Sequence, residues 1–498
     1  MFKKILIANR GEIALRVMRT CREMGIRTVA VYSEADRTAP HVLFADEAYP
    51  IGPAPSTESY LRYETILEVA ARAEAEAIHP GYGFLSENTT FAEAITQAGI
   101  TFIGPSAEAI QIMGDKTTAR ARMESAGVPV VPGSEAPIED PEQALATAEE
   151  IGFPVLIKAA GGGGGKGMRI VDGAKSFVNA VSQAQREAGS AFGDARVYIE
   201  KYLEEPHHIE FQILADQHGT VLHLGERECS IQRRYQKVIE ESPSPFLRAD
   251  ERAEMGAAAV EAARSCGYLG AGTVEFLMDA NHQFYFLEMN TRLQVEHPVT
   301  EMVTGIDLVA EQIRIAAGEA LAFDQEDITF SGHAVECRVY AEDSQHDFAP
   351  SVGEIKMLQV PDGAGTRFDG ALRQGLQVTP YYDPMLGKLI CWGRTREDAL
   401  NRMHRALSEF FIGGVQTTIH FCQAVINHPR FREGHYDTHF YQEHGAELTE
   451  NITAQSECEV LAASAALLTH QASRQNARAA ENADYNPSQW VRQHRRSR

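Results

Sequence analysis

The chain has 498 residues, of which 44% are hydrophobic and 23% are charged, a globular composition that excludes a disordered or collagen-like protein. Its 46 basic and 69 acidic residues give a formal charge of −23, which argues against nucleic acid as a bulk partner because neutralising phosphates requires clustered cations. The length suggests about three domains.

Targeting and redox signals are weak along the chain. No run of about 18 apolar residues occurs, so a membrane segment is not expected. The first apolar run stops at Asn9 and Arg10, too early for a secretory signal. The seven cysteines are scattered, odd in number and without a CxxC pair, which favours reduced thiols over disulfides or zinc. We therefore expect a cytoplasmic protein.

The first 110 or so residues predict a parallel α/β sheet. Strand-like apolar runs at 3–8, 28–32, 75–79 and 101–103 are separated by segments such as 12–24, whose apolar residues recur at helical spacing.

Beyond a helix-like run at 115–126, prolines and glycines between 129 and 141 indicate a break. Residues 153–159 and 168–171 are strand-like and flank a glycine run, and 176–189 are helix-like. The remaining expectations are β-rich segments at 196–200, 208–226 and 272–289, a mixed region at 333–445, and a peripheral helix with a frayed end after 447.

Five consecutive glycines at 161–165 precede Lys166 and Gly167. Because glycine loses the most backbone entropy on ordering, such a run predicts a backbone that passes close to a ligand, and Lys166 favours phosphate. Ala160 and Gly167 break the Walker pattern, and the GxGxxG at 162–167 precedes a strand-like run, where a dinucleotide fold has a helix. We interpret the loop as a flap over phosphates, with a flexible linker as the alternative.

The segments 273–279 and 284–290 predict a β-hairpin. Pairing the residues that flank its loop, 279 and 284, places Glu275 opposite Glu288, and like charges in that position repel. A divalent cation would remove the repulsion, and Asn290 adds an amide oxygen on the same face, so the hairpin predicts a Mg²⁺ site. Solvated acids on an exposed face are the alternative.

Asn290, Arg292, Gln294 and Glu296 alternate, so in an extended chain they share one face. An arginine can clamp a small planar anion through two hydrogen bonds, and a nearby carboxylate can act as a base. Metal ligands, anion clamp and base would then lie in one line. The charged segment 226–241 is either a solvated face or a basic lining for a polyphosphate.

Taken together, these motifs resemble the biotin carboxylase family from residue 2 to about 445. The matching segments are residues 7–14, 79–88, the glycine loop, 232–241, 288–298, 333–338 and 380–383. The resemblance implies an α/β and α+β multidomain protein of the ATP-grasp fold. It divides the chain into an N-terminal parallel α/β domain (1–114), an ATP-grasp domain (115–330) with a mobile lid at about 132–203, a C-terminal biotin carboxylase domain (331–446) and a helical or frayed extension (447–498).

The resemblance also implies the reaction, which is ATP-dependent carboxylation of biotin by bicarbonate through carboxyphosphate. Its requirements would be ATP, Mg²⁺ or Mn²⁺, bicarbonate, and biotin on a carrier protein. The sequence has no biotinyl-lysine motif and no room for a transferase domain. We therefore expect a free-standing, homodimeric component that works with a biotin carboxyl carrier protein and a carboxyltransferase subunit of an acetyl-CoA, pyruvate or similar carboxylase.

Roles are implied residue by residue. ATP would be bound by Lys116, Lys158, Gly163, Gly164, Gly165, Lys166, Gly167, Met168, Glu200, Lys201, Leu203, His208, Gln232 and Tyr235. The metal would be bound by Glu275, Glu288 and Asn290, and bicarbonate and biotin by Tyr82, Lys237, Arg292, Gln294, Val295 and Arg338. In catalysis, Glu296 would deprotonate bicarbonate and Arg338 would stabilise the biotin enolate, assisted by Lys237 and Arg292.

One residue departs from the family pattern. Tyr235 stands where many members have histidine, a difference that bears on nucleotide affinity. Two other functions stay open on the sequence. One is an ATP-grasp ligase with an amine or carboxylate acceptor, and the other is a nucleotide-binding regulatory protein without turnover, for which Tyr235 is the only support.

Overall fold

The computed structural model describes residues 1–134, 136–138, 140–159, 168–453 and 469–470. The chain divides into two compact units, 1–445 and 446–498. In the second unit, residues 446–453 are helical, and most of the predicted extension lies outside the described residues. Within the described part of the chain, no helix is long and apolar enough to cross a membrane.

The N-terminal segment forms the predicted parallel sheet. Its strands lie in the order β3-β2-β1-β4-β5, all pairs parallel. Helix α1 (Gly11–Glu23) buries the predicted stripe of Ile13, Val17 and Cys21. Strand β3 was not predicted, because Pro50 interrupts it and Ile51 alone is buried. The remaining bounds are β1 Lys4–Ile7, β2 Arg27–Ser33, β3 Glu47–Gly52, β4 Ala77–His79, β5 Thr101–Phe102, α2 Pro40–Phe44, α3 Tyr63–Arg72, α4 Thr89–Gln97 and α5 Ala107–Gly114.

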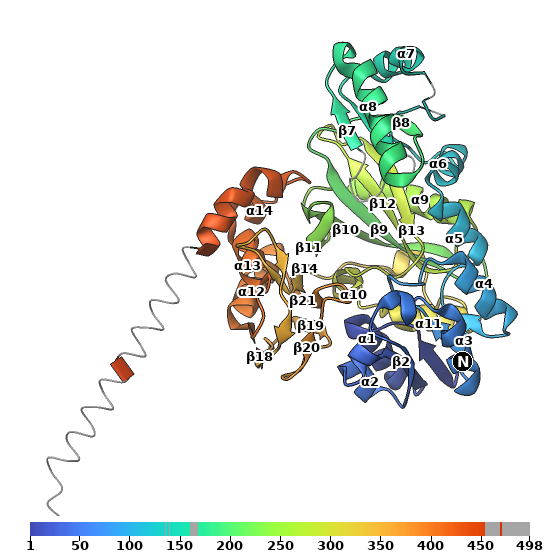
Figure 1. The fold of residues 1–498 in the computed structure, drawn as a ribbon, viewed down its shortest axis with the longest axis vertical. Coiled ribbons are helices and arrows are strands. Elements are labelled where there is room, and N and C mark those ends of the chain that lie inside the picture. The colour runs from blue at the N-terminus through green and yellow to red at the C-terminus, as the bar shows by residue number, and fades with distance from the viewer. Residues whose placement is uncertain (135, 139, 160–167, 454–468, 471–498) are drawn as a thin grey trace, which may run out of the picture. The chain divides into compact units, whose positions relative to one another are not determined.

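A small antiparallel sheet, in the order β7-β6-β8, follows the break after the first sheet. Figure 1 shows it gathered with two helices in one lobe. The strands confirm the sequence prediction, but residues 141–151 form a helix where prolines predicted only a break. The reason is local, because Pro141 occupies the first helical turn and the Asp140 carboxylate accepts from the Glu142 N–H at 2.9 Å. The bounds are β6 Val155–Ala159, β7 Met168–Val171, β8 Val197–Lys201, α7 Pro141–Ile151 and α8 Ala174–Phe192.

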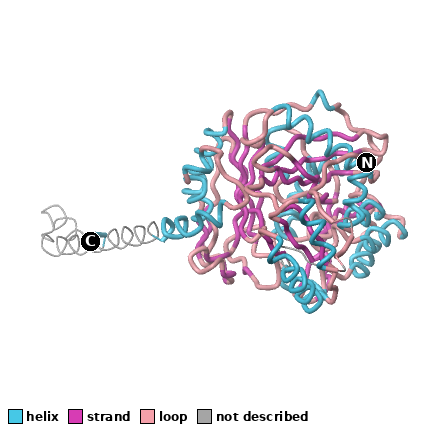
Figure 2. The backbone as a smooth tube through the Cα atoms, turned by 90° about the horizontal axis from the view of Figure 1, so that it is seen from above, coloured by secondary structure: helices cyan, strands magenta, loops and turns pink. Residues whose placement is uncertain are grey.

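The largest sheet has eight strands in the order β13-β12-β9-β10-β11-β14-β21-β19, with every neighbouring pair antiparallel. It contains strands from both sides of residue 330, so the predicted central and C-terminal regions share one hydrogen-bonded sheet. Figure 2 shows the strands flanked by helices. The strands are β9 His207–Ala215, β10 Val221–Arg233, β11 Gln236–Ser242, β12 Gly270–Met278, β13 Phe284–Asn290, β14 His333–Tyr340, β19 Thr366–Gly370 and β21 Met385–Gly393.

Helices and short strands complete the first unit. The helices are α6 Lys116–Ser125, α9 Ala249–Ser265, α10 His297–Thr304, α11 Leu308–Ala316, α12 Arg396–Glu409, α13 Ile419–Asn427 and α14 Pro429–Arg432. Three short antiparallel pairs are β15 (Glu342–Asp343) with β16 (Ala349–Pro350), β17 (Gly353–Glu354) with β20 (Gln377–Val378), and β18 (Met357–Gln359) with β22 (Phe411–Gly413).

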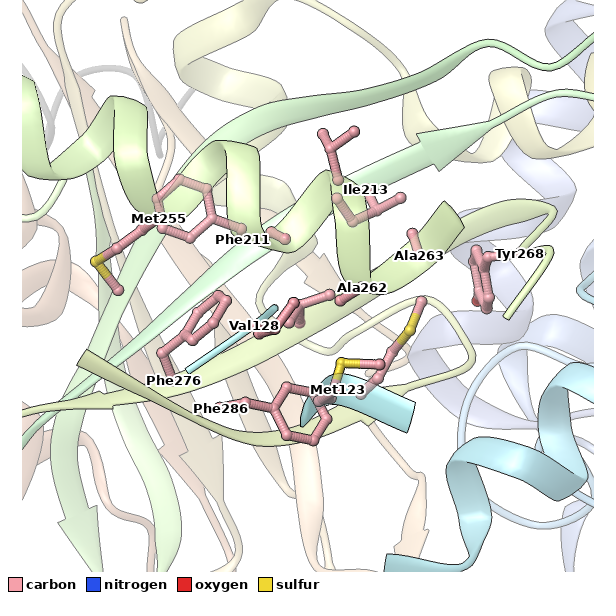
Figure 3. Close-up of a cluster of buried hydrophobic side chains, with 14 of the residues drawn as sticks. Met123, Val128, Phe211, Ile213, Met255, Ala262, Ala263, Tyr268, Phe276 and Phe286 are labelled. Atoms are coloured by element: carbon pink, nitrogen blue, oxygen red, sulfur yellow. The ribbon is translucent and has the colours of Figure 1, made fainter. Parts of the chain in front are cut away.

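A hydrophobic core lies between β9, β12 and β13 and the helices α6 and α9 (Figure 3). The fully buried ring of Phe276 packs edge-on against Phe211, with ring centroids 6.2 Å apart, and against Phe284 at 5.5 Å. These rings face away from Glu275, the next residue on β12, because side chains alternate along a strand. The core therefore fixes the strands whose opposite face carries the polar residues.

Replacing Phe276 with alanine should lower the free energy of unfolding by about 3–5 kcal/mol, because the buried ring leaves a cavity. Urea denaturation measures this loss. The matched control is Val352→Ala, whose side chain is 54% exposed and whose loss should cost no more than about 0.5 kcal/mol. Equal stability of the two variants would contradict this account of the core.

Candidate active site

The predicted carboxylate hairpin forms, and Glu275 lies directly opposite Glu288. The predicted pairing of 279 with 284 is wrong, because Met278 pairs with Phe284 and a bulge before Glu288 shifts the register. Asp279 explains the difference: its N–H bonds the Gln283 carbonyl, and its carboxylate accepts the N–H groups of Asn281 and Gln283, each at 2.9 Å. Residue 279 therefore belongs to the turn, and the bulge restores the facing acids.

Lys237 lies at the centre of the polar cluster. Its Nζ donates to Glu210 at 2.5 Å, to Glu275 at 2.8 Å and to Glu296 at 2.8 Å. An ammonium group has three protons, so each carboxylate takes one. Burial would lower the pKa of Lys237, but the three carboxylates raise it well above its usual value. The lysine is therefore a fixed cation that joins three acids.

The two facing carboxylates have different environments. Burial would raise the pKa of Glu275, but Lys237 and the His208 ring, 2.8 Å away, hold it far below its usual value. Glu288 lies at the mouth of the cleft and keeps contact with solvent; the negative charge of Glu275 is the main cause of its raised pKa, and partial desolvation by the surrounding residues is the second. Asn290 donates to Glu275 at 2.8 Å. Two facing carboxylates with a neighbouring amide form a group of residues suited to a hard divalent cation.

The segment after β13 does not continue as the predicted extended chain. It turns through residues 291–295, and Glu296 caps helix α10 with φ −79° and ψ 8°. The predicted side chains nevertheless converge: Arg292 donates to Asn290 at 3.1 Å and to Gln294 at 2.9 Å. The convergence therefore comes from a turn and its hydrogen bonds rather than from strand alternation.

Glu296 is fully buried and held by two cations. It accepts from Lys237 and, at 2.9 Å, from Arg338 of β14, which also donates to Glu240 at 2.6 Å. Burial would raise the pKa of Glu296, but Lys237 and Arg338 lower it well below its usual value. Glu296 is therefore an anion across the neutral pH range.

Most of the predicted site residues line one cleft of about 1140 Å³. They are Tyr82, Lys158, Met168, Leu203, His208, Gln232, Tyr235, Lys237, Glu275, Glu288, Asn290, Arg292, Gln294, Val295 and Arg338. Gly163, Gly164, Gly165, Lys166 and Gly167 lie outside the described residues.

Four predicted residues are not in the lining. Glu296 lies beneath it, and Glu200 forms an ion pair with Lys158, which does line it. Lys201 donates to the carbonyls of Gly152 at 2.8 Å and Phe153 at 3.2 Å. Lys116 begins α6.

Sequence reasoning missed the apolar part of the cleft. Leu156, Leu277 and Leu287 form it, and residues 438, 439, 441 and 442, which are polar or aromatic and come from the end of the first unit, also line the cleft. Leu277 had a usable signal, since it lies two residues from Glu275 and so on the same face of the strand. Residues near 440 had none, because they reach the cleft through tertiary contacts such as the Thr438 N–H to the Pro206 carbonyl at 3.1 Å.

Tyr235 occupies a tight two-residue turn between β10 and β11. Arg234 and Tyr235 have φ of 51° and 65°, the left-handed region that side chains other than glycine seldom adopt. The Tyr235 side chain is 66% exposed and borders the cleft. The turn therefore places residue 235 at the cleft regardless of whether it is tyrosine or histidine.

Glu12, on α1, is another unpredicted residue of the cleft lining. Neither of its buried carboxylate oxygens has a hydrogen-bond partner among the described residues, and the Lys388 Nζ lies 3.5 Å away. Burial raises the pKa of Glu12 to about 7, and Lys388 offsets only part of that rise. Glu12 therefore changes charge close to neutral pH.

Three family models match the chain: "Biotin carboxylase, N-terminal domain" over residues 1–110, "Carbamoyl-phosphate synthase L chain, ATP binding domain" over 115–323, and "Biotin carboxylase C-terminal domain" over 336–443. The chain is 57% identical over 442 residues to a biotin carboxylase of Nostoc, covering 89% of this chain and 99% of that protein. It is 55% identical over 443 residues to biotin carboxylase 1 of Bacillus subtilis, covering 89% and 98% respectively. A pyruvate carboxylase component of Methanothermobacter thermautotrophicus is 56% identical, covering 89% and 90%.

Solved structures agree. The biotin carboxylase domain of a 2-oxoglutarate carboxylase from Hydrogenobacter thermophilus, solved as a dimer with MgADP and bicarbonate, is 51% identical with a TM-score of 0.84, covering 90% of this chain and 99% of that one. A biotin carboxylase from Campylobacter jejuni is 49% identical with a TM-score of 0.85, covering 89% and 99%. The predicted ATP-grasp architecture is confirmed.

The raised pKa of Glu12 predicts a pH dependence of stability. Because the folded state binds the Glu12 proton more tightly than the unfolded state, Glu12 ionisation weakens folding as pH rises from about 4.5 to about 7 and adds nothing further above that. Relative to Glu12→Gln, the wild-type chain should lose about 1 kcal/mol of unfolding free energy per pH unit between pH 5.5 and 7. Urea denaturation at several pH values measures it; a difference independent of pH would contradict the assignment.

Proposed function

This chain belongs to the biotin carboxylase family and catalyses the ATP-dependent carboxylation of biotin by bicarbonate through carboxyphosphate, and we propose that the cleft around Lys237 is where it does so. The observation that carries the proposal is the convergence of two facing acids, an arginine clamp and a buried ionised carboxylate on one cleft.

The residues at the hairpin fit a divalent cation. Glu275 and Glu288 face each other, and the repulsion between them is the main cause of the raised pKa of Glu288. Glu275 and Glu288 would hold the cation, whose charge would remove that repulsion, and Asn290 would be a further ligand. When bound, Mg²⁺ would neutralise the charge that develops on the phosphate oxygens. The protein's own contribution is to hold the three donors on two paired strands.

ATP would lie along the same cleft. The apolar side chains of Leu203, Leu277 and Leu287 suit a base, while Lys158 and His208 suit phosphates. Lys158 forms an ion pair with Glu200, so its ammonium is already oriented before a nucleotide arrives. This arrangement supports the ATP-binding roles implied for these residues by the family resemblance.

Bicarbonate would bind between Arg292, Gln294, the Val295 N–H and Lys237, with Glu296 as its base. A carboxylate with a very low pKa is a weak base. Lys237 can change the pKa of Glu296, because it donates three hydrogen bonds in this structure and each goes to a carboxylate. Moving one of them from Glu296 to an incoming anion removes a stabilising contact and raises the pKa of Glu296 toward a useful value.

The deprotonated bicarbonate oxygen then attacks the γ-phosphoryl group and ADP leaves. Carboxyphosphate breaks down to CO₂ and phosphate, the phosphate takes the biotin N1 proton, and N1 attacks CO₂. Arg338 donates to Glu296, and this position beside the base supports the role proposed for its guanidinium, which is to stabilise the enolate that forms as N1 loses its proton. Tyr82 borders the same part of the cleft and suits the biotin ring.

We further propose that the chain acts as a homodimer with a biotin carboxyl carrier protein and a carboxyltransferase subunit. The dimer of the Hydrogenobacter domain and the solved biotin carboxylase subunit of a pyruvate carboxylase support this. A cytoplasmic location is supported by the six described cysteines, all buried and free. The division at about residues 114, 330 and 446 is proposed as the domain organisation.

Release of ADP by the purified chain with ATP, Mg²⁺ and bicarbonate, with and without free biotin, tests the function. Biotin should increase the rate, and only when bicarbonate is present. Glu296→Gln keeps the shape but removes the base, so it should lower this rate by ~100-fold or more while nucleotide affinity changes little. Unchanged turnover in this variant would exclude Glu296 as the base.

Glu288→Gln should raise the Mg²⁺ concentration needed for half-maximal ADP release by ~10-fold or more, because the site loses one anionic ligand. Glu288 is the cleaner choice, since Glu275 also holds Lys237. Glu254→Gln, an exposed acid on α9, is the control and should leave the Mg²⁺ requirement unchanged. Equal Mg²⁺ curves for wild type and Glu288→Gln would rule out the proposed ligand.

A further inference from the structure

Val295 and Glu296, which are joined by the peptide bond that the Val295 carbonyl belongs to, carry two groups that the reaction needs. The Val295 N–H would bind bicarbonate, and the Glu296 carboxylate would deprotonate it. Lys237 and Arg338 hold the carboxylate end. The backbone at this point lies in a turn, outside any strand ladder, so the sheet does not hold it. A different contact has to fix the direction of the peptide.

Lys388 supplies that contact. Its Nζ donates to the Val295 carbonyl oxygen, which belongs to the peptide that joins Val295 to Glu296. The lysine side chain is 0% exposed, although lysine is almost never fully buried unless it has partners. Fixing this carbonyl fixes the plane of the peptide and with it the starting direction of the Glu296 side chain.

The sheet places Lys388 beside Arg338. In the β14–β21 ladder Arg338 lies directly opposite Lys388, and in the β19–β21 ladder Asp369 does. Directly opposite residues point to the same face of a sheet. Arg338 and Lys388 therefore both point toward residues 295 and 296. Arg338 bonds the Glu296 carboxylate, and Lys388 bonds the Val295 carbonyl.

Two further contacts tie Lys388 to the N-terminal segment. The Glu12 Oε1 lies 3.5 Å from its Nζ, and the Tyr82 ring centroid lies 5.6 Å from it. Asn9 holds the loop that carries Tyr82, donating to the Pro80 carbonyl at 2.7 Å and the Tyr82 carbonyl at 2.8 Å. Lys388 thus lies where the segments proposed to meet bicarbonate and biotin come together.

We propose that Lys388 is a positioning residue for the carboxylation step, one that acts by holding the Val295–Glu296 peptide so that the base and the bicarbonate donor point at the same place. This inference rests on the proposed function, because it assigns Lys388 a role through Glu296. Small errors in the placement of a catalytic group are costly, since productive geometry requires tolerances of about 0.5 Å.

Lys388→Met removes the ammonium and keeps most of the side-chain volume. Biotin- and bicarbonate-dependent kcat should fall by ~10–100-fold, while KM for ATP stays within about twofold of wild type, because the nucleotide contacts are untouched. Lys388→Gln keeps an N–H donor on a shorter side chain, so its kcat should lie between those of wild type and Lys388→Met. It also serves as the test variant if the methionine variant does not fold. Wild-type kcat in a folded Lys388→Met or Lys388→Gln chain would overturn the proposal.

A double-mutant cycle separates positioning from a purely structural role. In the Glu296→Asp background the base is already displaced, so Lys388→Met should cost a smaller factor in kcat than it does in wild type. An equal factor in both backgrounds would mean that Lys388 does not act through Glu296, and would overturn the proposal.

Arg396→Met is the matched control for the loss of a buried cation. Arg396 bonds Glu241 and two backbone carbonyls without touching the cleft. It should lower the melting temperature and leave kcat near wild type; a kcat loss as large as that of Lys388→Met would reduce the lysine to a structural role.

Wild type without biotin-dependent ADP release, or an unaffected Glu296→Gln, contradicts the proposed function itself. Active wild type, inactive Glu296→Gln and fully active Lys388→Met contradict only the role of Lys388.

Discussion

One buried ammonium group holds the site together. Glu210, Glu275 and Glu296 come from β9, β12 and the start of α10, and each accepts a hydrogen bond from the same Lys237 Nζ. Three carboxylates buried this close repel one another strongly, and the repulsion is larger in a medium of low dielectric constant. With the lysine present, the cluster becomes a set of charge-assisted hydrogen bonds that fixes three segments in one arrangement. Arg227 is a second buried cation of this kind, and it donates to Glu210 at 2.5 Å and to Gln212 at 2.8 Å.

The parts of this arrangement that depend on local pattern could be predicted from the sequence. The apolar spacing of 12–24 was enough to predict α1. The hairpin pattern predicted that Glu275 faces Glu288, and this is correct because a bulge offsets the one-residue shift in the pairing next to the turn. The register next to the turn was not predictable by simple counting, because it depends on how the Asp279 carboxylate bonds the turn backbone. The direction of the 291–296 segment is likewise set by long-range contacts from Lys237, Arg338 and Lys388, the longest of which joins residues 93 positions apart in the chain.

Residue roles came mainly from the family resemblance, and the structure adds a physical reason for several of them. The convergence of Arg292, Asn290 and Gln294 is explained by their mutual hydrogen bonds. Leu287 carries no chemical signature in the sequence, because an apolar lining residue looks the same as any other core residue. The residues near 440 carry none either, because their place in the cleft depends on tertiary contacts. Lys388 is similar, since a lysine within an apolar strand indicates only that it has partners, and those partners are on distant segments.

The eight-stranded sheet explains why the groups proposed to bind biotin and bicarbonate hold a fixed position relative to one another. Arg338 and Lys388 belong to β14 and β21, beyond the boundary expected at 330, yet these strands hydrogen-bond continuously with β11, β10, β9 and β12. The geometry between Glu275, Lys237 and Arg338 is therefore set by strand register rather than by the packing of separate domains. The lobe of β6, β7 and β8 forms its own sheet. Because no strand ladder among the described residues joins this lobe to the eight-stranded sheet, the register that fixes the charged cluster does not depend on where the lobe lies.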